Sequence, residues 1–86
     1  MKVVYKYTLT GPESVIEMPA GARLLKAGVQ NTSIVIWALV DDDVFKVVRK
    51  IGAINTGFAF EPEGTYLDTV TVGAIAWHIF DFGEKP

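Results

Sequence analysis

The sequence is a succession of short apolar runs, each closed by a turn signal. The runs are rich in β-branched and aromatic residues, and glycine, proline or asparagine separates most of them. Such runs are typical of antiparallel strands, and the chain lacks the long crossover segment that a parallel sheet needs. We therefore predict an all-β fold, a small antiparallel β-sandwich or partly open barrel of about seven short strands with little or no helix. The predicted strands are residues 3–9, 14–18, 23–30, 33–40, 43–51, 65–72 and 74–82.

Alternation along these strands indicates which residues face the core. In residues 23–30, the side chains of Leu25, Ala27 and Val29 are expected on one face, because successive residues of a strand point to opposite sides. Residues 33–40 run from Ile34 onward without a polar residue. Such a run is expected of a central strand that is covered on both faces.

The segment 43–51 fits two structures. Asp42 could cap a helix that ends at Gly52, since Val44 and Ile51 would share one helical face. A strand fits as well, because the segment is rich in β-branched residues. We favour the strand and keep the helix as the alternative.

The chain length permits one domain. We predict a single β domain over residues 1–86, with residues 83–86 as a frayed tail. Half of the residues are hydrophobic, and most of these must be buried to offset the conformational entropy lost on folding. Little volume then remains for an internal cavity. A ligand site is therefore expected in a surface groove or between subunits.

The net charge and the residue types present limit the classes of ligand and partner that we expect. Eight Lys and Arg against ten Asp and Glu give a net charge of -2 without a long run of either sign, which argues against polymeric nucleic acid. The chain has no cysteine and one histidine, so no thiolate or multi-histidine metal site and no cofactor is predicted. No apolar stretch reaches the roughly 18 residues of a membrane span, and we expect a cytoplasmic protein. The edges of so apolar a sheet favour a homo-oligomer.

No group of side chains forms a recognisable catalytic set, so we expect no enzyme activity. His78 is the only histidine, and neither Ser14 nor Ser33 has the sequence context of a hydrolase nucleophile. The three aspartates at 41–43 could bind a hard cation such as calcium, but no glycine or distant glutamate completes a calcium loop. We interpret them as a solvated turn.

Three residues are candidates for polar contacts with a ligand. Asn55 and Thr56 end a predicted strand just before Gly57, where an amide and backbone N–H groups can face a phosphate or a base edge. His78 shares a face with small residues such as Ala76, which leave room for a ligand. The alternative for His78 is a partly buried histidine that is hydrogen-bonded within the protein.

Arg49 and several aromatic residues complete the set of candidates. Arg49 lies among apolar neighbours, so it either pairs with a carboxylate, Asp68 or Glu17, or reaches a ligand phosphate with its guanidinium. Phe58 and Tyr66 could stack on a base. The other aromatic residues weighed for stacking are Phe60, Trp37 and Trp77, and core packing is the better interpretation of both tryptophans.

Five segments together resemble a family of small uncharacterised proteins from phages and prophages. They are residues 5–9, 15–22, 29–31, 36–41 and 76–80, which read YKYTL, VIEMPAGA, VQN, IWALVD and AWHIF. The resemblance covers nearly the whole chain. The family has a Gly-Thr-Gly turn where this chain has Asn55-Thr56-Gly57.

The resemblance implies a small, oligomeric phage accessory protein in the host cytoplasm. One recurring role of small phage β proteins is to sequester nucleotide immune signals, as the Sequestin and Lockin types do. On that reading, Arg49 and the Asn55–Thr56 turn would hold the phosphates of a cyclic ADP-ribose-like ligand or a cyclic dinucleotide at a subunit interface. His78, Phe58 and Tyr66 would contact its ribose and base. The alternative is a non-enzymatic accessory protein that binds another protein or the virion.

Overall fold

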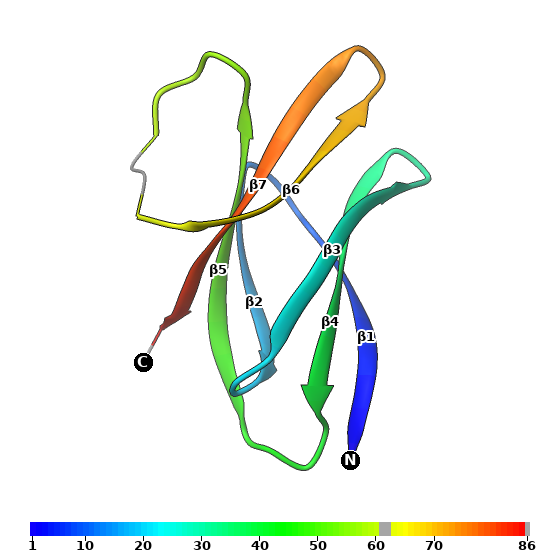
Figure 1. The fold of residues 1–86 in the computed structure, drawn as a ribbon, viewed down its shortest axis with the longest axis vertical. Helices are drawn as coiled ribbons and strands as arrows, with labels where there is room; N and C mark the ends of the chain where they lie inside the picture. The colour runs from blue at the N-terminus through cyan, green and yellow to red at the C-terminus, as the bar shows by residue number, and fades with distance from the viewer. Residues whose placement is uncertain (61–62, 86) are drawn as a thin grey trace.

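The protein is all-β, with seven strands in two antiparallel sheets (Figure 1). The computed structural model describes residues 1–60 and 63–85. This architecture confirms the predicted fold class, and no helix lies in the described ranges. The three-stranded sheet has the order β1-β4-β3, and the four-stranded sheet has the order β2-β5-β7-β6. The strands are β1 Lys2–Thr8, β2 Glu13–Pro19, β3 Arg23–Gln30, β4 Ser33–Asp41, β5 Lys46–Asn55, β6 Thr65–Val72 and β7 Ile75–Lys85.

The observed strands lie close to the predicted ones, and the segment 43–51 is resolved in favour of a strand. β5 begins at Lys46, and its residues pair with β2 on one side and β7 on the other. The tail differs from the expectation of fraying at residue 83. β7 continues to Lys85, because Val48 and Arg49 of β5 extend the ladder to the end of the strand.

Two tight hairpins set the register of their strands. Asn31 and Thr32 connect β3 to β4 with φ angles of 50° and 65°, the left-handed conformation that a two-residue turn with the twist of the sheet requires. Gly73, with a φ of 61°, begins the connection between β6 and β7. This second hairpin places Thr69 directly opposite His78.

The core lies between the two sheets, and β2, β4, β5 and β7 supply its largest buried apolar side chains. β4 is the central strand of its sheet, as predicted. Its inward residues Ile36 and Val40 meet residues of the opposite sheet in one apolar cluster. The largest fully buried apolar side chains are those of Met18, Ile36, Val40, Ile51 and Ile79.

The described part of the chain contains no helix that is long and apolar enough to cross a membrane.

β6 contributes the smaller Val70, which belongs to the same cluster. The outward face of β4 is less well covered than expected. Trp37 and Leu39 remain partly exposed there. Trp37 packs against Gly28, where an added Cβ would stand 2.8 Å from the Cζ3 atom of the indole. The prediction that both tryptophans pack in the core holds for Trp77 alone, which contacts the core cluster.

The sheets approach each other along β3 and β6, and Asp68 joins them there. One carboxylate oxygen of Asp68 accepts a hydrogen bond from the backbone N–H of Ala27 at 3.1 Å, and the other accepts one from Thr69 at 2.9 Å. Lys26 lies 3.5 Å from the same carboxylate. Burial alone would raise the pKa of Asp68, but these hydrogen bonds and the lysine outweigh it, so the pKa lies below its ordinary value of 3.8.

This depressed pKa predicts an acid-sensitive connection between the sheets. The stabilisation by ionised Asp68 is fully present above the unfolded-state pKa and is lost as the pH falls through the lower pKa of the folded state. Asp68→Asn should therefore make the denaturant midpoint depend less on pH below about 5 than it does in the wild type. Urea titrations at several pH values measure this difference. Equal losses of stability in the two proteins would contradict the assignment.

Candidate functional site

The candidate site lies on the outer face of the four-stranded sheet. A hollow of about 200 Å³ is bordered by residues of β5, β6, β7 and the segment that follows β5. Alternation explains the position, because Trp77 and Ile79 of β7 point into the core and His78 and Phe80 therefore point outward. The lining residues are Ile54, Asn55, Thr56, Gly57, Phe58, Phe60, Tyr66, His78 and Phe80.

A chain of hydrogen bonds fixes the polar side of the hollow. The Nε2 atom of His78 lies 2.7 Å from the hydroxyl oxygen of Thr56, and its Nδ1 atom lies 3.0 Å from that of Thr69. The hydroxyl of Thr69 also lies 2.6 Å from the phenolic oxygen of Tyr66. Both ring nitrogens of His78 therefore have hydroxyl partners, which hold the imidazole in one orientation.

Aromatic rings form the apolar side. Phe60 packs on Phe80 with ring centroids 4.8 Å apart, and Tyr66 meets Phe80 edge-on with centroids 5.6 Å apart. Phe58 is not part of this stack, and 69% of its surface is exposed. An exposed aromatic ring beside hydroxyl and amide groups offers both stacking and hydrogen bonding to a planar ligand.

Asn55 contributes the one buried side-chain oxygen without a hydrogen-bond partner among the described residues. Its Oδ1 atom is inaccessible to solvent, although the residue as a whole is only partly buried. A second hollow of about 370 Å³ lies on the other side of Asn55, Thr56 and Phe58, toward Ala74 and Ala76. An unpaired buried acceptor costs free energy, and a donor from a ligand would remove that cost.

A larger hollow of about 430 Å³ adjoins the first and shares Ile54 and Phe60 with it. Its border includes the cations Lys50 and Lys85. Lys50 lies 5.5 Å from the centre of the Phe82 ring and pairs with Glu13 at 3.3 Å. Because both partners of this ion pair are solvent-accessible, an incoming anion can displace the carboxylate at small cost.

Arg49 is separate from this site. Its Nε and Nη2 atoms donate to the two carboxylate oxygens of Asp81 at 3.1 and 2.6 Å, and its Nη1 atom donates to the carbonyl of Ala22 at 2.5 Å. Of the two alternatives for Arg49, the structure shows the ion pair. The partner is Asp81, however, and neither Asp68 nor Glu17, because the pairing of β5 with β7 brings Asp81 alongside.

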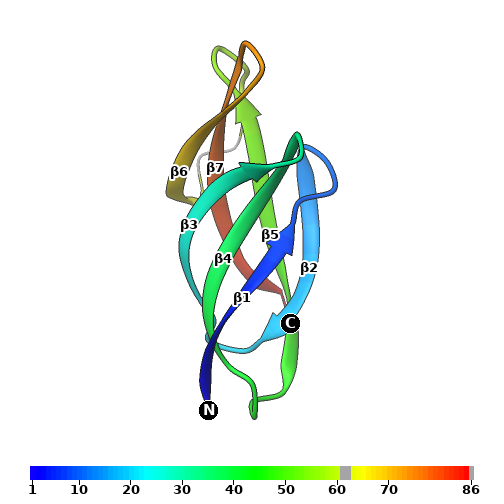
Figure 2. The same cartoon turned by 90° about the vertical axis from the view of Figure 1, so that its right-hand side faces the viewer.

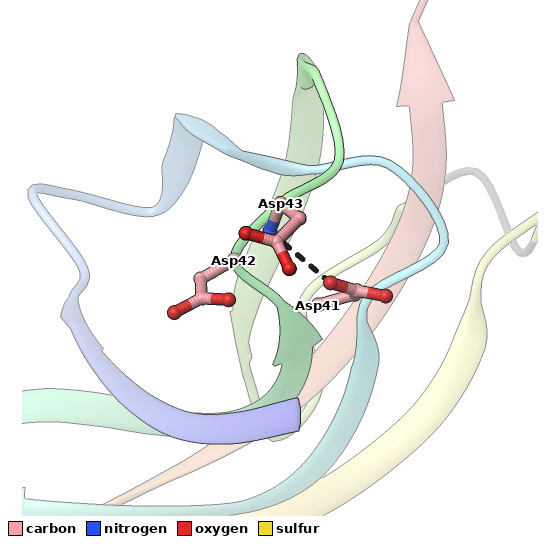
Figure 3. Close-up of side chains that lie close together, drawn as sticks. All are labelled: Asp41, Asp42 and Asp43. Carbon is pink, nitrogen blue, oxygen red and sulfur yellow. Dashed lines mark hydrogen bonds between the residues drawn. The ribbon is translucent and has the colours of Figure 1, made fainter. Parts of the chain in front are cut away.

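The aspartates at 41–43 form a compact acidic cluster (Figure 3). The ammonium group of Met1 lies 3.0, 3.2 and 2.7 Å from Asp41, Asp42 and Asp43, respectively. Hydrogen bonds to these carboxylates, that of Asp43 first, raise the pKa of the amine from 8.0 to about 10. The cluster is therefore already partly neutralised by a cation of the chain itself.

The structure brings five of the six predicted ligand-binding residues to the 200 Å³ hollow, and only Arg49 lies elsewhere. Sequence reasoning missed Thr69 and Phe80, as well as the role of Lys50 beside the neighbouring hollow. Thr69 could have been found, because the predicted hairpin around Gly73 sets it opposite His78. Phe80 lies two residues after His78 and so shares its face.

Comparison with known proteins identifies a family without an assigned function. The family model described as a domain of unknown function, DUF7352, matches residues 1–85. No curated protein and no solved structure matches the chain. Because the match covers nearly all of the sequence, this chain belongs to the DUF7352 family.

Proposed function

We propose that this protein binds a small nucleotide-derived ligand on the outer face of its four-stranded sheet and holds it without chemical change. In an infected cell it would withdraw a signalling molecule of the cyclic ADP-ribose or cyclic dinucleotide type from its effector, since bound ligand is removed from the free pool. The observation that carries the proposal is that five of the six predicted binding residues meet at one hollow.

The chemistry of the hollow suits a planar, polar-edged group such as a nucleobase. Phe58 and Tyr66 are 69% and 55% exposed, so their rings are free to stack. Asn55 borders the hollow, and its covered Oδ1 atom lacks a donor, so a rotation of the side chain toward the hollow would let that atom accept from a base amino group. The hydroxyl of Thr56 is exposed and hydrogen-bonds His78, which makes it a pre-oriented contact for a sugar hydroxyl.

The size of the hollows supports a ligand that extends beyond one of them. Small-molecule sites commonly measure about 300–1,000 Å³. The first hollow, at about 200 Å³, is large enough for a single ring system, and the adjoining hollow of about 430 Å³ offers Lys50 and Lys85 to a phosphate. Phosphate recognition is thereby reassigned from Arg49, whose guanidinium is already paired with Asp81.

Binding accounts for the polar residues better than catalysis does. Thr56 and His78 are as close as a nucleophile and its general base, at 2.7 Å. In a catalytic triad a carboxylate orients and stabilises the imidazole, whereas here its other nitrogen meets the hydroxyl of Thr69. A neutral hydroxyl does not stabilise an imidazolium in that way. The arrangement thus favours a fixed hydrogen-bonding surface.

Phe58→Ala is expected to weaken ligand binding by about 5- to 150-fold, the range that corresponds to the loss of one base-stacking contact of about 1–3 kcal/mol. Isothermal titration calorimetry with cyclic ADP-ribose isomers and cyclic dinucleotides measures the affinity. Because the Phe58 ring is mostly exposed, its removal should leave the fold intact. If none of these ligands binds the wild-type protein, the proposal is wrong.

Phe45→Ala is the matched control. Phe45 is 74% exposed and lies in the connection between β4 and β5, away from the residues that border the hollow. Its removal should leave the affinity unchanged. Equal weakening in both variants would point to a general effect on the protein rather than to stacking at Phe58.

A second candidate function is binding of an acidic protein surface by the outer face of the three-stranded sheet. Trp37 lies in the centre of this face, with Lys6 opposite it on β1 and Lys26 opposite it on β3. Val4 and Leu25 are also exposed on this side. An apolar centre with a charged rim is typical of protein interfaces. Recovery of one stoichiometric protein by the wild type, but not by Trp37→Ala, would favour this candidate.

A further inference from the structure

The free edges of β1 and β2 are complementary to each other. In the described part of the chain, β1 pairs only with β4, and β2 pairs only with β5. These two strands are consecutive, yet they belong to different sheets and form no ladder together. They diverge from the short connection between them in both views of the fold (Figures 1 and 2). Each strand therefore leaves a row of backbone groups unpaired along one side.

The connection between β1 and β2 keeps the two edges apart. The N–H of Leu9, just after β1, donates to the carbonyl of Ile34 in the three-stranded sheet at 2.9 Å. The carbonyl of Pro12, just before β2, accepts from the N–H of Ala53 in the four-stranded sheet at 2.7 Å. Because each end is tied to its own sheet, closure of β1 onto β2 within one chain would break these contacts.

We propose that a second copy of this chain fills the opening, with β1 of each copy pairing antiparallel to β2 of the other. Each copy supplies both edges, so two equivalent ladders form about a two-fold axis and the assembly closes as a dimer. No partner of another kind is needed to pair the two edges.

One register matches charge and apolar character at every outward position. On the outward side of β1, Lys2, Val4 and Lys6 alternate. Glu13, Val15 and Glu17 do so on β2 with the same spacing. An antiparallel register that sets Lys6 opposite Glu13 also sets Val4 opposite Val15 and Lys2 opposite Glu17.

The inward side agrees with the same register. It sets Val3 opposite Ile16 and Tyr5 opposite Ser14, and all four residues lie on the side of their strands that faces the core. Tyr5 is nevertheless 44% exposed in the single chain, because no strand lies beside it at the opening. A partner strand would cover this ring.

Burial and charge both favour this pairing over the alternatives. Val4 and Val15 are 54% and 65% exposed, and the ladder would remove both from water. Each edge carries charges of one sign, so opposite charges favour β1 against β2 over pairing of two identical edges. Glu13 already contacts Lys50, and Lys6 contacts Gln30, but these exposed contacts exchange at little cost.

Charge exchange tests the dimer without disturbing the core. The wild type should have twice the chain mass of 9.4 kDa by light scattering. The double variants Lys2→Glu/Lys6→Glu and Glu13→Lys/Glu17→Lys should each be monomeric, or should dimerise at least tenfold more weakly, because both ladders then oppose like charges. An equimolar mixture of the two variants should restore the dimer, since both ladders are complementary in the mixed pair.

Recovery in the mixture would also show that both variants are folded. A monomeric wild type, charge variants that remain fully dimeric, or a mixture that stays monomeric would each overturn the proposal. The outcome is independent of ligand binding, which the calorimetric titrations measure separately.

Discussion

Asp81→Ala is expected to lower the free energy of unfolding by about 3–5 kcal/mol, because it leaves the guanidinium of Arg49 largely buried without its main counter-charge. The side chains of Arg49 and Asp81 are only 13% and 16% exposed. Asp81 also accepts the backbone N–H of Gly83 at 2.8 Å, and that bond is lost as well. For a domain of this size the expected fall in Tm is roughly 12–40 °C. Thermal and urea unfolding followed by circular dichroism measure the change.

Two further variants separate the loss of the ion pair from a general effect of substitution. Lys50, next to Arg49 in the sequence, forms an ion pair with Glu13 that is far more open to solvent, so Lys50→Ala should cost less than about 1 kcal/mol. Arg49→Met combined with Asp81→Leu removes both charges together and should be more stable than Asp81→Ala alone. If the double variant is as unstable as the single one, packing rather than the unpaired charge is responsible.

The sequence predicted the strands well because the information needed was local. Alternation, β-branched residues and turn signals place strands without knowledge of the rest of the fold. The predicted limits of residues 23–30 and 65–72 coincide with β3 and β6. The two hairpins follow from turns at Asn31-Thr32 and Gly73.

The face of the sheet on which each side chain lies was less predictable where a strand contains a bulge. The register between β3 and β4 shifts between Leu24 and Lys26, so Leu25 does not share the inward face with Ala27. Leu25 is 42% exposed, whereas Leu24 packs against the core. A bulge of this kind depends on the partner strand and leaves no clear mark in the sequence of one strand.

Pairing between strands that are far apart in the sequence also explains two differences from the prediction, the partner of Arg49 and the order at the C-terminal end of β7. The partner of Arg49 follows from the pairing of β5 with β7, and no spacing along the chain reveals that Asp81 lies beside it. The same pairing orders β7 as far as Lys85. In the candidate site, by contrast, His78 and Thr69 belong to one hairpin, so a local register places them together.

Ile79→Ala is expected to lower the free energy of unfolding by about 2–5 kcal/mol, because it removes a fully buried side chain and leaves a cavity. Ile79 lies on β7, between β5 and β6, where it pairs with Ala53 and Asp68. The milder Ile79→Val should cost about 0.5–1.5 kcal/mol. Urea unfolding of the three proteins gives the values.

Ile75→Ala is the matched control, since it makes the same change on the same strand at a side chain that is 49% exposed. It should alter the free energy of unfolding by no more than about 0.5 kcal/mol. Equal costs at the two positions would contradict the assignment of Ile79 to the core. Because Ile79 points inward, its neighbours His78 and Phe80 must point outward to the hollow. A large difference between the two isoleucines would therefore also support the orientation on which the candidate site depends.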